Sequence, residues 1–378
     1  SDAAAKAHAQ DPDSDLAFWC AAIRDCIAAH LEDTAAESAP DLARVEDRAR
    51  SLALSMDFGF LLDPEKKLLS IGFAVSTNTR DPNCYDLLAF EARLASLFAI
   101  AKGDVPTRHW FRLGRAATPV GAGSALISWS GSMFEYLMPS LVMRAPAGSV
   151  LEQTNRLIVR RQIAYGAAHT MPWGVSESAY NARDLEMTYQ YSNFGVPGLG
   201  LKRGLNENRV IAPYATGLAT MVDPRAALRN FDRLAEIGAG GRYGFYEAVD
   251  FTAKRLPADA DHAIVQSFMA HHQGMTIAAI ANTLQAGRLR TLFHAEPIIR
   301  AVDLLLQERV PRDATAALPR AGAVQVTAAE ISDAPVVRRF DAPAEGMQTG
   351  HLLSNGSYGV ALTPTGGGYS RWRDLAIT

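Results

Sequence analysis

The chain has 378 residues, of which 48% are hydrophobic and 20% are charged, and its formal net charge is −3. This composition is typical of a globular protein with a large core, and it excludes long disordered acidic or basic tails. The small net charge lacks the electrostatic footprint of a nucleic-acid-binding protein, so no nucleic acid is expected as a partner and a neutral substrate fits better.

Three cysteines, Cys20, Cys26 and Cys84, show neither CxxC spacing nor an even count, which indicates reduced thiols in a cytoplasmic protein. The sequence has no apolar run of the roughly 18 residues that a membrane span requires, and its first thirty residues lack a signal-peptide pattern. It begins at Ser1 without a methionine and ends at Thr378 within a patterned segment. We therefore expect a piece of a larger protein.

Helices are expected over most of the chain up to about residue 312. The clearest runs from Pro224 to Ile237, where Asp223 can cap the first turn, apolar residues recur at i, i+3 and i+4, and Gly238 stops the pattern. A similar apolar face between Leu87 and Ala101 predicts a helix that Gly103 ends. Further helices are expected near residues 13–32, 40–54, 131–143, 149–167, 262–284 and 297–309.

Strands are expected in two places. The segment Phe60–Phe73 has a turn between two apolar runs, as a β-hairpin would. After Pro311 the composition changes to Val, Thr and Gly in short alternating runs, such as Val324–Thr327, Pro335–Arg338 and Tyr358–Thr363. We therefore divide the chain into a helical domain, residues 1–312, and a β-type segment, residues 313–378.

Three loop segments combine carboxylates, aromatic residues and glycines more densely than connectors require: residues 128–139, 172–184 and 241–250. Glycoside chemistry needs two carboxyl groups that flank the bond and flat apolar surfaces for the sugar rings, and these segments supply both. The carboxyl candidates are Glu135, Glu177 and Glu247. The candidates for sugar contact in the same segments are Trp129, Trp173, Tyr180, Arg183, Asp184, Tyr243 and Tyr246.

Each candidate also has a structural explanation. Glu135 stands near an expected helix start, where a negative charge stabilises the helix dipole. Glu177 lies between two serines in a loop without helical periodicity, and the alternative for it is a solvated loop acid. Glu247 lies in an aromatic stretch that should be partly buried, where a carboxylate must be paired or protonated. Aromatic residues near glycine turns more often pack against a core than hold a sugar.

The histidines do not predict a metal site. His271 and His272 are adjacent, so they lack the i, i+4 spacing by which a helix presents two ligands to one metal. Together with Gln273 they can line a polar pocket that binds hydroxyl groups, and a satisfied core cluster is the alternative. The glycine-rich run Gly195–Gly204 lacks the Walker and GxGxxG patterns, so we expect neither a metal nor a nucleotide cofactor.

Several longer stretches of the sequence are distinctive. They include Met56–Glu65, His109–Arg115, Gly131–Pro139, Trp173–Arg183, Tyr189–Gly200, Tyr243–Glu247, His271–Met275 and Phe293–Pro297. Together they resemble the glycoamylase-like central region of cyclic β-1,2-glucan synthases, over nearly the whole chain. In that family a membrane-embedded glycosyltransferase region precedes this domain and a phosphorylase-like region follows it. The segments His351–Gly359 and Gly368–Asp374 look like the start of the phosphorylase-like region.

The resemblance implies an all-α fold, an (α/α)6 toroid, and an anomer-retaining transglycosylase that closes linear β-1,2-glucan into a ring. One carboxylate then attacks the anomeric carbon, and the other protonates the leaving oxygen and later activates the incoming hydroxyl. We assign this pair to Glu177 and Glu247, with Glu135 in reserve, and leave open which acts as the nucleophile. Tyr189 and Tyr191 join the candidates for sugar contact.

Two other functions stay open at this point: an inverting endo-β-1,2-glucanase-type hydrolase, and a non-catalytic module that holds the glucan. The expected partners are linear and cyclic β-1,2-glucan and the neighbouring glycosyltransferase and phosphorylase-like regions of a full-length chain. The resemblance also places the domain on the cytoplasmic side of the bacterial inner membrane, as part of a larger membrane protein.

Overall fold

The computed structural model describes residues 14–35, 39–257, 259–309, 351–354, 358–363, 367–372 and 375–376. The chain divides into two compact units, residues 1–324 and residues 325–378, and each unit is described by itself. The expected domain boundary at residues 312 and 313 lies outside the described residues.

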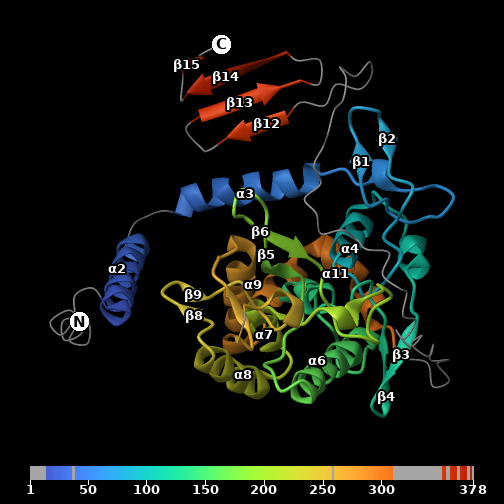
Figure 1. Ribbon diagram of the computed structural model, residues 1–378. Helices are drawn as coiled ribbons and strands as arrows, with labels where there is room; N and C mark the ends of the chain where they lie inside the picture. The colour runs from blue at the N-terminus through green and yellow to red at the C-terminus, as the bar shows by residue number, and fades with distance from the viewer. Residues whose placement is uncertain are drawn as a thin grey trace. The chain divides into compact units, whose positions relative to one another are not determined.

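The first unit is mainly helical (Figure 1). Its α-helices are α2 (Asp15–Ala35), α3 (Ala39–Ser55), α4 (Arg93–Lys102), α5 (Met133–Leu137), α6 (Val150–Ala168), α7 (Pro213–Ala219), α8 (Pro224–Glu236), α9 (Ala270–Leu284), α10 (Arg288–Ala295) and α11 (Pro297–Val302). The 3-10 helices η3 (Met138–Leu141) and η6 (Asp303–Gln307) extend α5 and α11.

Short antiparallel strands lie between these helices (Figure 1). The two-stranded pairs are β1 (Phe73–Ala74) with β2 (Thr79–Arg80), β3 (Ala117–Val120) with β4 (Gly123–Leu126), β5 (Ser178–Arg183) with β6 (Tyr189–Ser192), and β8 (Gly240–Gly241) with β9 (Gly244–Phe245). A three-stranded sheet has the order β11 (Ala263–Val265), β10 (Ala248–Asp250) and β7 (Val210–Ile211).

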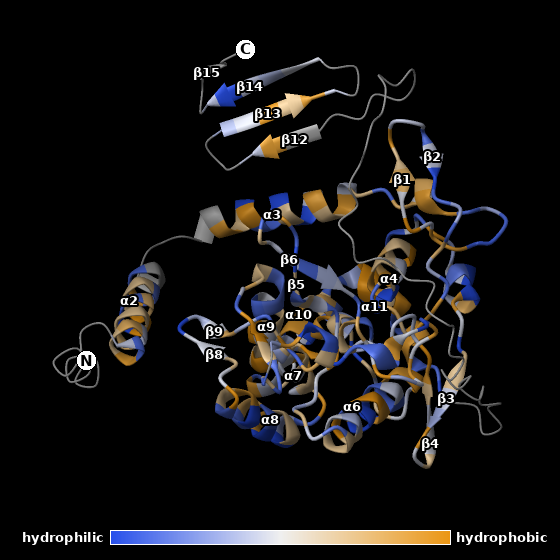
Figure 2. Ribbon diagram, viewed as in Figure 1, coloured by the Kyte–Doolittle hydropathy of each residue, from blue (hydrophilic) through white to orange (hydrophobic). Residues whose placement is uncertain are grey.

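Helix α7 lies in the core of the first unit, and all seven of its residues are buried. A helix that is apolar or small on every side is buried on every side, and α7 packs against both α8 and α9. Helix α8 instead has two faces, because Leu234 is fully buried while Leu228 is 64% exposed. Figure 2 shows hydrophilic and hydrophobic residues on different sides of α8.

The expected helix from Pro224 to Ile237 is confirmed as α8. The side chain of Asp223 accepts a hydrogen bond from the amide of Ala226 at 2.9 Å and caps the helix, and Pro224 occupies the first helical position. The expected hairpin at Phe60–Phe73 is present only as one isolated antiparallel bridge between Leu62 and Leu69, and Phe73 pairs instead with Arg80 in the β1–β2 hairpin.

Two expected helices begin later than the sequence indicated. Helix α4 begins at Arg93 instead of Leu87, because Leu87 forms a bridge with Gly114 and the chain turns before the helix. Helix α9 begins at Ala270 instead of residue 262, because Ala263–Val265 form strand β11 against β10. In both places an apolar run that fits a helix pairs as a strand or bridge, which the periodicity alone does not distinguish.

The second unit contains an antiparallel sheet with the order β12 (His351–Ser354), β13 (Tyr358–Leu362), β14 (Gly368–Trp372) and β15 (Leu375–Ala376). The expected strand at Tyr358–Thr363 is thereby confirmed. The expected strands at Val324–Thr327 and Pro335–Arg338 lie outside the described residues. Within the described ranges, no helix is long and apolar enough to span a bilayer.

Candidate active site

Glu177 lies at the end of the loop that leads into β5, and it is anchored at two points. The hydroxyl of Tyr191, on the paired strand β6, donates a hydrogen bond to Oε1 of Glu177 at 3.0 Å. The hydroxyl of Tyr214, on α7, donates to the main-chain oxygen of Glu177 at 3.0 Å. Burial raises the pKa of Glu177, and the hydrogen bond from Tyr191 acts against this rise. A half-buried carboxyl group is therefore fixed in one orientation at the surface of the unit.

Glu247 lies directly before β10, and its side chain is 0% exposed. Its Oε1 accepts a hydrogen bond from the amide of Ala179 at 3.2 Å, and its Oε2 lies 2.9 Å from Nδ1 of His272. Both carboxyl oxygens are thus engaged by protein groups. Glu247 was expected to be partly buried and either paired or protonated; it is fully buried and paired.

His272 connects the two glutamates. Its ring stacks on the ring of Tyr214 with centroids 3.7 Å apart and an interplanar angle of 13°. Its Nδ1 faces Glu247, and its Nε2 lies 3.5 Å from the hydroxyl of Tyr191, which in turn contacts Glu177. The structure therefore brings together Glu177, Tyr191, His272 and Glu247, all expected from the sequence, and adds Tyr214, which was not.

Glu135 has a different environment. It is 2% exposed, and its carboxyl group accepts hydrogen bonds from the Ser128 hydroxyl at 2.6 Å and from the amides of Ser130, Gly131 and Ser132 at 2.9 to 3.3 Å. Burial raises its pKa, and the hydrogen bonds from Ser128 and Ser130 oppose that rise. The helix-start explanation for Glu135 fits this geometry, because its amide also bonds to the Ser132 side chain in a capping box.

Glu91 is a carboxyl group that the sequence did not single out. It lies in the turn before α4, and its Oε2 atom is buried without a hydrogen-bond partner in the part of the chain that the structure describes. Burial raises its pKa from 4.5 to about 8, and the charges of Glu135 and Glu177 act in the same direction. Perturbed carboxyl groups of this kind are concentrated at functional sites. The only signal for it in the sequence is an acid directly after the apolar run Leu87–Phe90, where the apolar pattern predicts a regular helix.

Three of the expected sugar-contact residues present exposed ring faces: Trp129 is 49% exposed, Tyr191 is 43% exposed and Tyr243 is 58% exposed. Trp173 is 4% exposed, and its main-chain amide and oxygen both bond to the side chain of Asn230, so it packs in the core. The ring of Tyr246 lies against Phe268 with centroids 5.1 Å apart.

The remaining expected residues mainly stabilise local structure. Arg183 lies over the ring of Tyr189 and bonds to its hydroxyl, within the β5–β6 hairpin. Asp184 closes the turn of the same hairpin by accepting from the amide of Thr188 at 2.8 Å. The side chain of Gln273 donates to the main-chain oxygen of Phe245 at 3.0 Å. Tyr180 packs on Phe194, and the ring centroids of His271 and His272 lie 4.0 Å apart.

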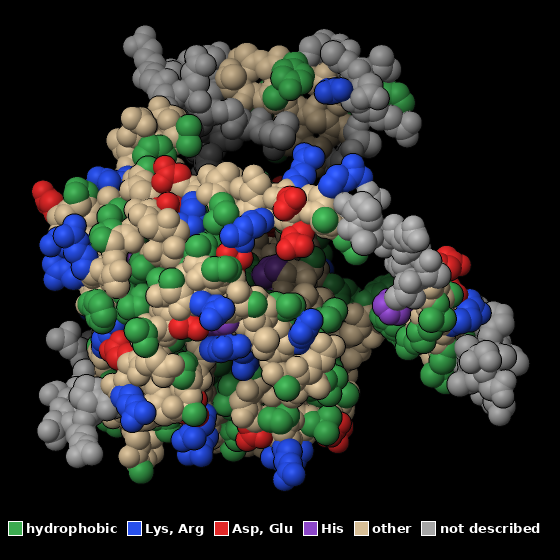
Figure 3. All heavy atoms as spheres, turned by 180° about the vertical axis from the view of Figure 1, so that it is seen from behind, with side chains coloured by type: hydrophobic (Ala, Val, Ile, Leu, Met, Phe, Trp, Pro, Cys, Tyr) green, Lys and Arg blue, Asp and Glu red, His purple; other side chains and the backbone are tan. Residues whose placement is uncertain are grey.

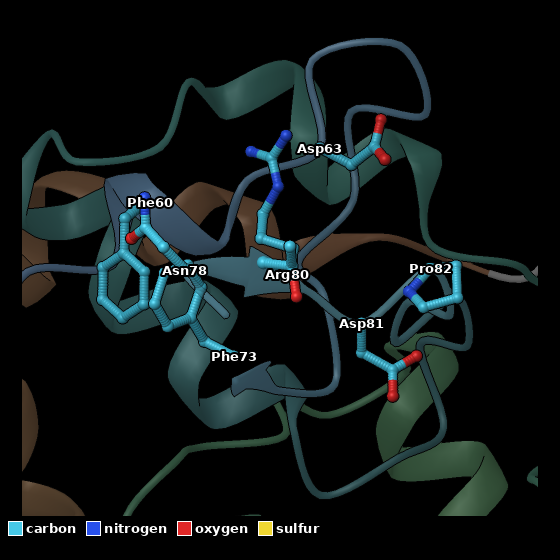
Figure 4. Close-up of a pocket in the computed structure, with 8 residues that line it drawn as sticks. Phe60, Asp63, Phe73, Asn78, Arg80, Asp81 and Pro82 are labelled. Atoms are coloured by element: carbon cyan, nitrogen blue, oxygen red, sulfur yellow. The ribbon is translucent and has the colours of Figure 1, made fainter. Parts of the chain in front are cut away.

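The face of the molecule in Figure 3 is hollowed, with acidic side chains at the edge of the hollow and a histidine within it. A separate open hollow of about 520 Å³ lies on the β1–β2 hairpin (Figure 4). Phe60, Phe73, Asn78 and Arg80 line this second hollow, and none of the expected site residues does. We place the candidate active site at Glu177 because the perturbed carboxyl groups are found there. Among the described residues, no three His, Cys, Asp or Glu side chains form a group that could hold a metal ion.

Residues 84–297 match the glycoamylase family, whose description is "Putative glucoamylase". The chain belongs to this glycoamylase family. Residues 333–378 also match the supersandwich domain of glycosyl hydrolase 94, which includes the four strands of the second unit.

The chain is 51% identical over 376 residues to the cyclic β-(1,2)-glucan synthase NdvB of Rhizobium meliloti. This match covers 96% of the chain but 13% of the length of that relative.

Two solved structures share the fold. One is an endo-β-1,2-glucanase from Chitinophaga pinensis in complex with sophorotriose and glucose, with a TM-score of 0.51, 15% identity, and coverage of 69% of this chain and 64% of that one. The other is an endo-β-1,2-glucanase mutant from Talaromyces funiculosus with β-1,2-glucan, with a TM-score of 0.53, 14% identity, and coverage of 76% and 63%. The expected fold class, a glycoamylase-like helical toroid followed by a β-type segment, is confirmed.

Proposed function

We propose that the chain is an anomer-retaining transglycosylase that closes linear β-1,2-glucan into a cyclic product. The observation that carries this proposal is a pair of carboxyl groups with different environments. Glu177 accepts a hydrogen bond from Tyr191, and Glu91 has a strongly raised pKa to which the charge of Glu177 contributes. Pairs of carboxyl groups whose environments differ in this way serve as nucleophile and acid in glycoside chemistry. The similarity to NdvB, a cyclic β-(1,2)-glucan synthase, supports β-1,2-glucan as the substrate and ring closure as the outcome.

We assign the nucleophile to Glu177. Its Oε1 accepts a hydrogen bond from Tyr191, which favours the ionised form, and the half-buried carboxyl group is open to a ligand. We assign the acid/base role to Glu91, because a carboxyl group with a pKa of about 8 keeps its proton at neutral pH. This assignment replaces our expectation for Glu247, whose side chain is fully buried and whose two oxygens are engaged by Ala179 and His272.

The reaction proceeds in two displacements. In the first, an oxygen of Glu177 bonds to the anomeric carbon of a glucosyl unit, the glycosidic bond breaks, and the leaving oxygen takes the proton of Glu91. In the second, the 2-hydroxyl of the non-reducing end of the same glucan attacks this carbon, gives its proton to Glu91, and displaces Glu177. The product is a ring, and both glutamates return to their starting states.

The second candidate function is an inverting endo-β-1,2-glucanase. The similarity in fold to the glucanase from Chitinophaga pinensis favours it. An inverting enzyme needs room for a water between its carboxyl groups, which then stand about 6.5–9.5 Å apart, whereas a retaining pair stands about 5–5.5 Å apart.

Incubation of the chain with linear β-1,2-glucan tests the proposal. We expect products that are lighter than the corresponding linear chains by the mass of one water, as measured by mass spectrometry, and retained anomeric configuration in early time points by NMR. Shorter linear products of inverted configuration would establish the hydrolase instead. No turnover by the chain alone, together with glucan synthesis by the longer protein that persists after Glu177→Gln, would favour the non-catalytic module that holds the glucan.

We further propose that the chain works within a larger membrane-bound synthase on the cytoplasmic side of the bacterial inner membrane. Its partners there would be a glycosyltransferase region that supplies linear glucan and a phosphorylase-like region, of which residues 333–378 resemble the start. The small share of NdvB that the chain matches supports this setting.

A further inference from the structure

Glu247 is a carboxyl group that the proposed reaction does not use, although it lies close to Glu177. A carboxyl group whose side chain is 0% exposed cannot contact a sugar without a rearrangement of its surroundings. Burial of such a group is costly unless its oxygens are hydrogen-bonded, and here the Ala179 amide and His272 Nδ1 satisfy them at 3.2 and 2.9 Å. Any effect of Glu247 on the reaction must therefore pass through the groups that it contacts.

His272 is the group through which Glu247 can act. Oε2 of Glu247 lies 2.9 Å from Nδ1 of His272, and this contact fixes the rotation of the ring. Stacking on Tyr214 at 3.7 Å fixes the ring plane. The remaining nitrogen, Nε2, then points to the hydroxyl of Tyr191 at 3.5 Å.

Two tyrosines, Tyr191 and Tyr214, link His272 to Glu177. Tyr191 contacts His272 on one side and donates to the carboxyl group of Glu177 on the other. The ring of Tyr214 stacks on the His272 ring, and its hydroxyl donates to the main-chain oxygen of Glu177. The pKa of Tyr191 is raised by burial and by the charge of Glu177, so its hydroxyl remains a donor at every working pH. The side chain and the backbone of Glu177 are thus both held by residues that pack on one histidine.

We propose that Glu247 and His272 are positioning residues for the reaction: the buried Glu247 carboxylate orients His272, which holds Tyr191 and Tyr214 in the positions from which they aim the nucleophile Glu177. This inference rests on the proposed role of Glu177. It also explains why a fully buried acid and histidine lie directly behind an exposed catalytic surface, where buried polar networks stabilise one geometry.

The test compares Tyr191→Phe, Glu247→Gln and the double variant in turnover of linear β-1,2-glucan. We expect each single change to lower kcat about 10- to 100-fold with little change in KM, as for a lost hydrogen bond to a charged group. Because Glu247 acts partly through Tyr191, the double variant should lose clearly less activity than the product of the two single losses predicts. Additive losses, or an unchanged kcat in Glu247→Gln, would overturn the inference. If Glu247→Gln does not fold, His272→Asn takes its place in the same cycle.

A pH profile separates positioning from a purely structural role. Loss of the Tyr191 hydrogen bond raises the pKa of Glu177, so the acidic limb of kcat/KM should move to higher pH in Tyr191→Phe and in Glu247→Gln. The other charged or titratable groups around Glu177 are Glu91, Glu135, Lys202, Tyr214 and His272, and they are unchanged in Tyr191→Phe. An acidic limb that stays in place in both variants would contradict the inference.

Asp250→Asn serves as the matched control. Asp250 is another fully buried carboxylate, on β10 three residues after Glu247, but it pairs with Arg255 at 2.7 Å and has no contact with His272 among the described residues. We expect this variant to lose stability without a shift of the acidic limb. Glu177→Gln is measured beside it: if Glu177→Gln retains turnover, the proposed function fails, whereas an inactive Glu177→Gln with additive losses at Tyr191 and Glu247 refutes this inference alone.

Discussion

Ser132 and Glu135 cap the N-terminus of α5 reciprocally. The Glu135 amide donates to Oγ of Ser132 at 3.3 Å, and the Ser132 amide donates to Oε2 of Glu135 at 3.3 Å. The same carboxyl group also accepts from Ser128, Ser130 and Gly131, so it fixes the loop that carries Trp129. Glu135 therefore holds this loop together from beneath its surface.

We predict that Glu135→Gln destabilises the chain by about 1–3 kcal/mol, because an amide nitrogen would replace one acceptor among several converging donors. Thermal or denaturant unfolding measures this loss. Turnover per folded molecule should fall far less than in Glu177→Gln. The control is Glu236→Gln at the exposed end of α8, which should leave stability unchanged. A fully stable but inactive Glu135→Gln would show that Glu135 takes part in the chemistry.

The glycine-rich run Gly195–Gly204 packs against the loop that Glu135 caps. A Cβ atom on Gly195 would lie 1.8 Å from the main-chain oxygen of Ser130, and one on Gly200 would lie 2.4 Å from the carbonyl carbon of Ser130. These glycines are needed for the close approach of two backbones.

We predict that Gly195→Ala destabilises the chain by at least about 2 kcal/mol, since two main-chain segments must separate to admit the methyl group. The activity of the remaining folded protein should also fall, because Trp129 and the Glu135 loop move with Ser130. Gly72→Ala is the control, as a Cβ there has open space around it. Equal unfolding midpoints for the two variants would refute the predicted packing role.

Local signals in the sequence located several elements of the fold correctly. The cap at Asp223 and the one-sided apolar pattern after it define α8, and the alternating tail predicts β13. These local signals do not predict pairing between segments that are distant in the sequence. Ile264 and Val265 fit the apolar pattern of a helix, but their partners Val249 and Ala248 on β10 decide that they form a strand. The bridge between Leu87 and Gly114 decides the start of α4 in the same way.

The candidate site, like the fold, was predictable from the sequence only in part. Loop composition and the family resemblance selected Glu177, Tyr191, His272 and Glu247, which the fold brings into contact. The sequence predicted partial burial of Glu247 but not its full enclosure, because that depends on β5 and α9, which are distant in the sequence. Glu91 was missed for the corresponding reason: its raised pKa arises from burial and from charges that only the folded chain places beside it.

Rescue by azide can assign the roles of Glu177 and Glu91. Glu91→Ala should form the glycosyl-enzyme from a glucooligosaccharide with a nitrophenyl leaving group, and azide should then attack its anomeric carbon to give a β-glycosyl azide of retained configuration. Glu177→Ala lacks the nucleophile, so azide should displace the leaving group directly and give the α-glycosyl azide. NMR of the two products distinguishes them. If Glu247→Ala instead of Glu177→Ala gave the α product, Glu247 would be the nucleophile.

The raised pKa of Glu91 predicts opposite effects of one substitution on activity and on stability. Between pH 4.5, the ordinary carboxyl value, and about pH 8, the unfolded chain has released this proton while the folded chain retains it. Because the folded state binds more protons in this window, stability falls as the pH rises from about 4.5 to about 8. Glu91→Gln removes the ionisable group, so its unfolding midpoint should exceed that of the unsubstituted chain at pH 8 and approach it at pH 4.5. Turnover requires the protonated acid, so it should decline above about pH 8 in the unsubstituted chain and be lost at all pH values in Glu91→Gln. Unfolding curves and rates measured across the same buffers test both effects. A stability difference that does not change with pH would show that Glu91 ionises normally, and the acid/base role would then have to be assigned to another carboxyl group.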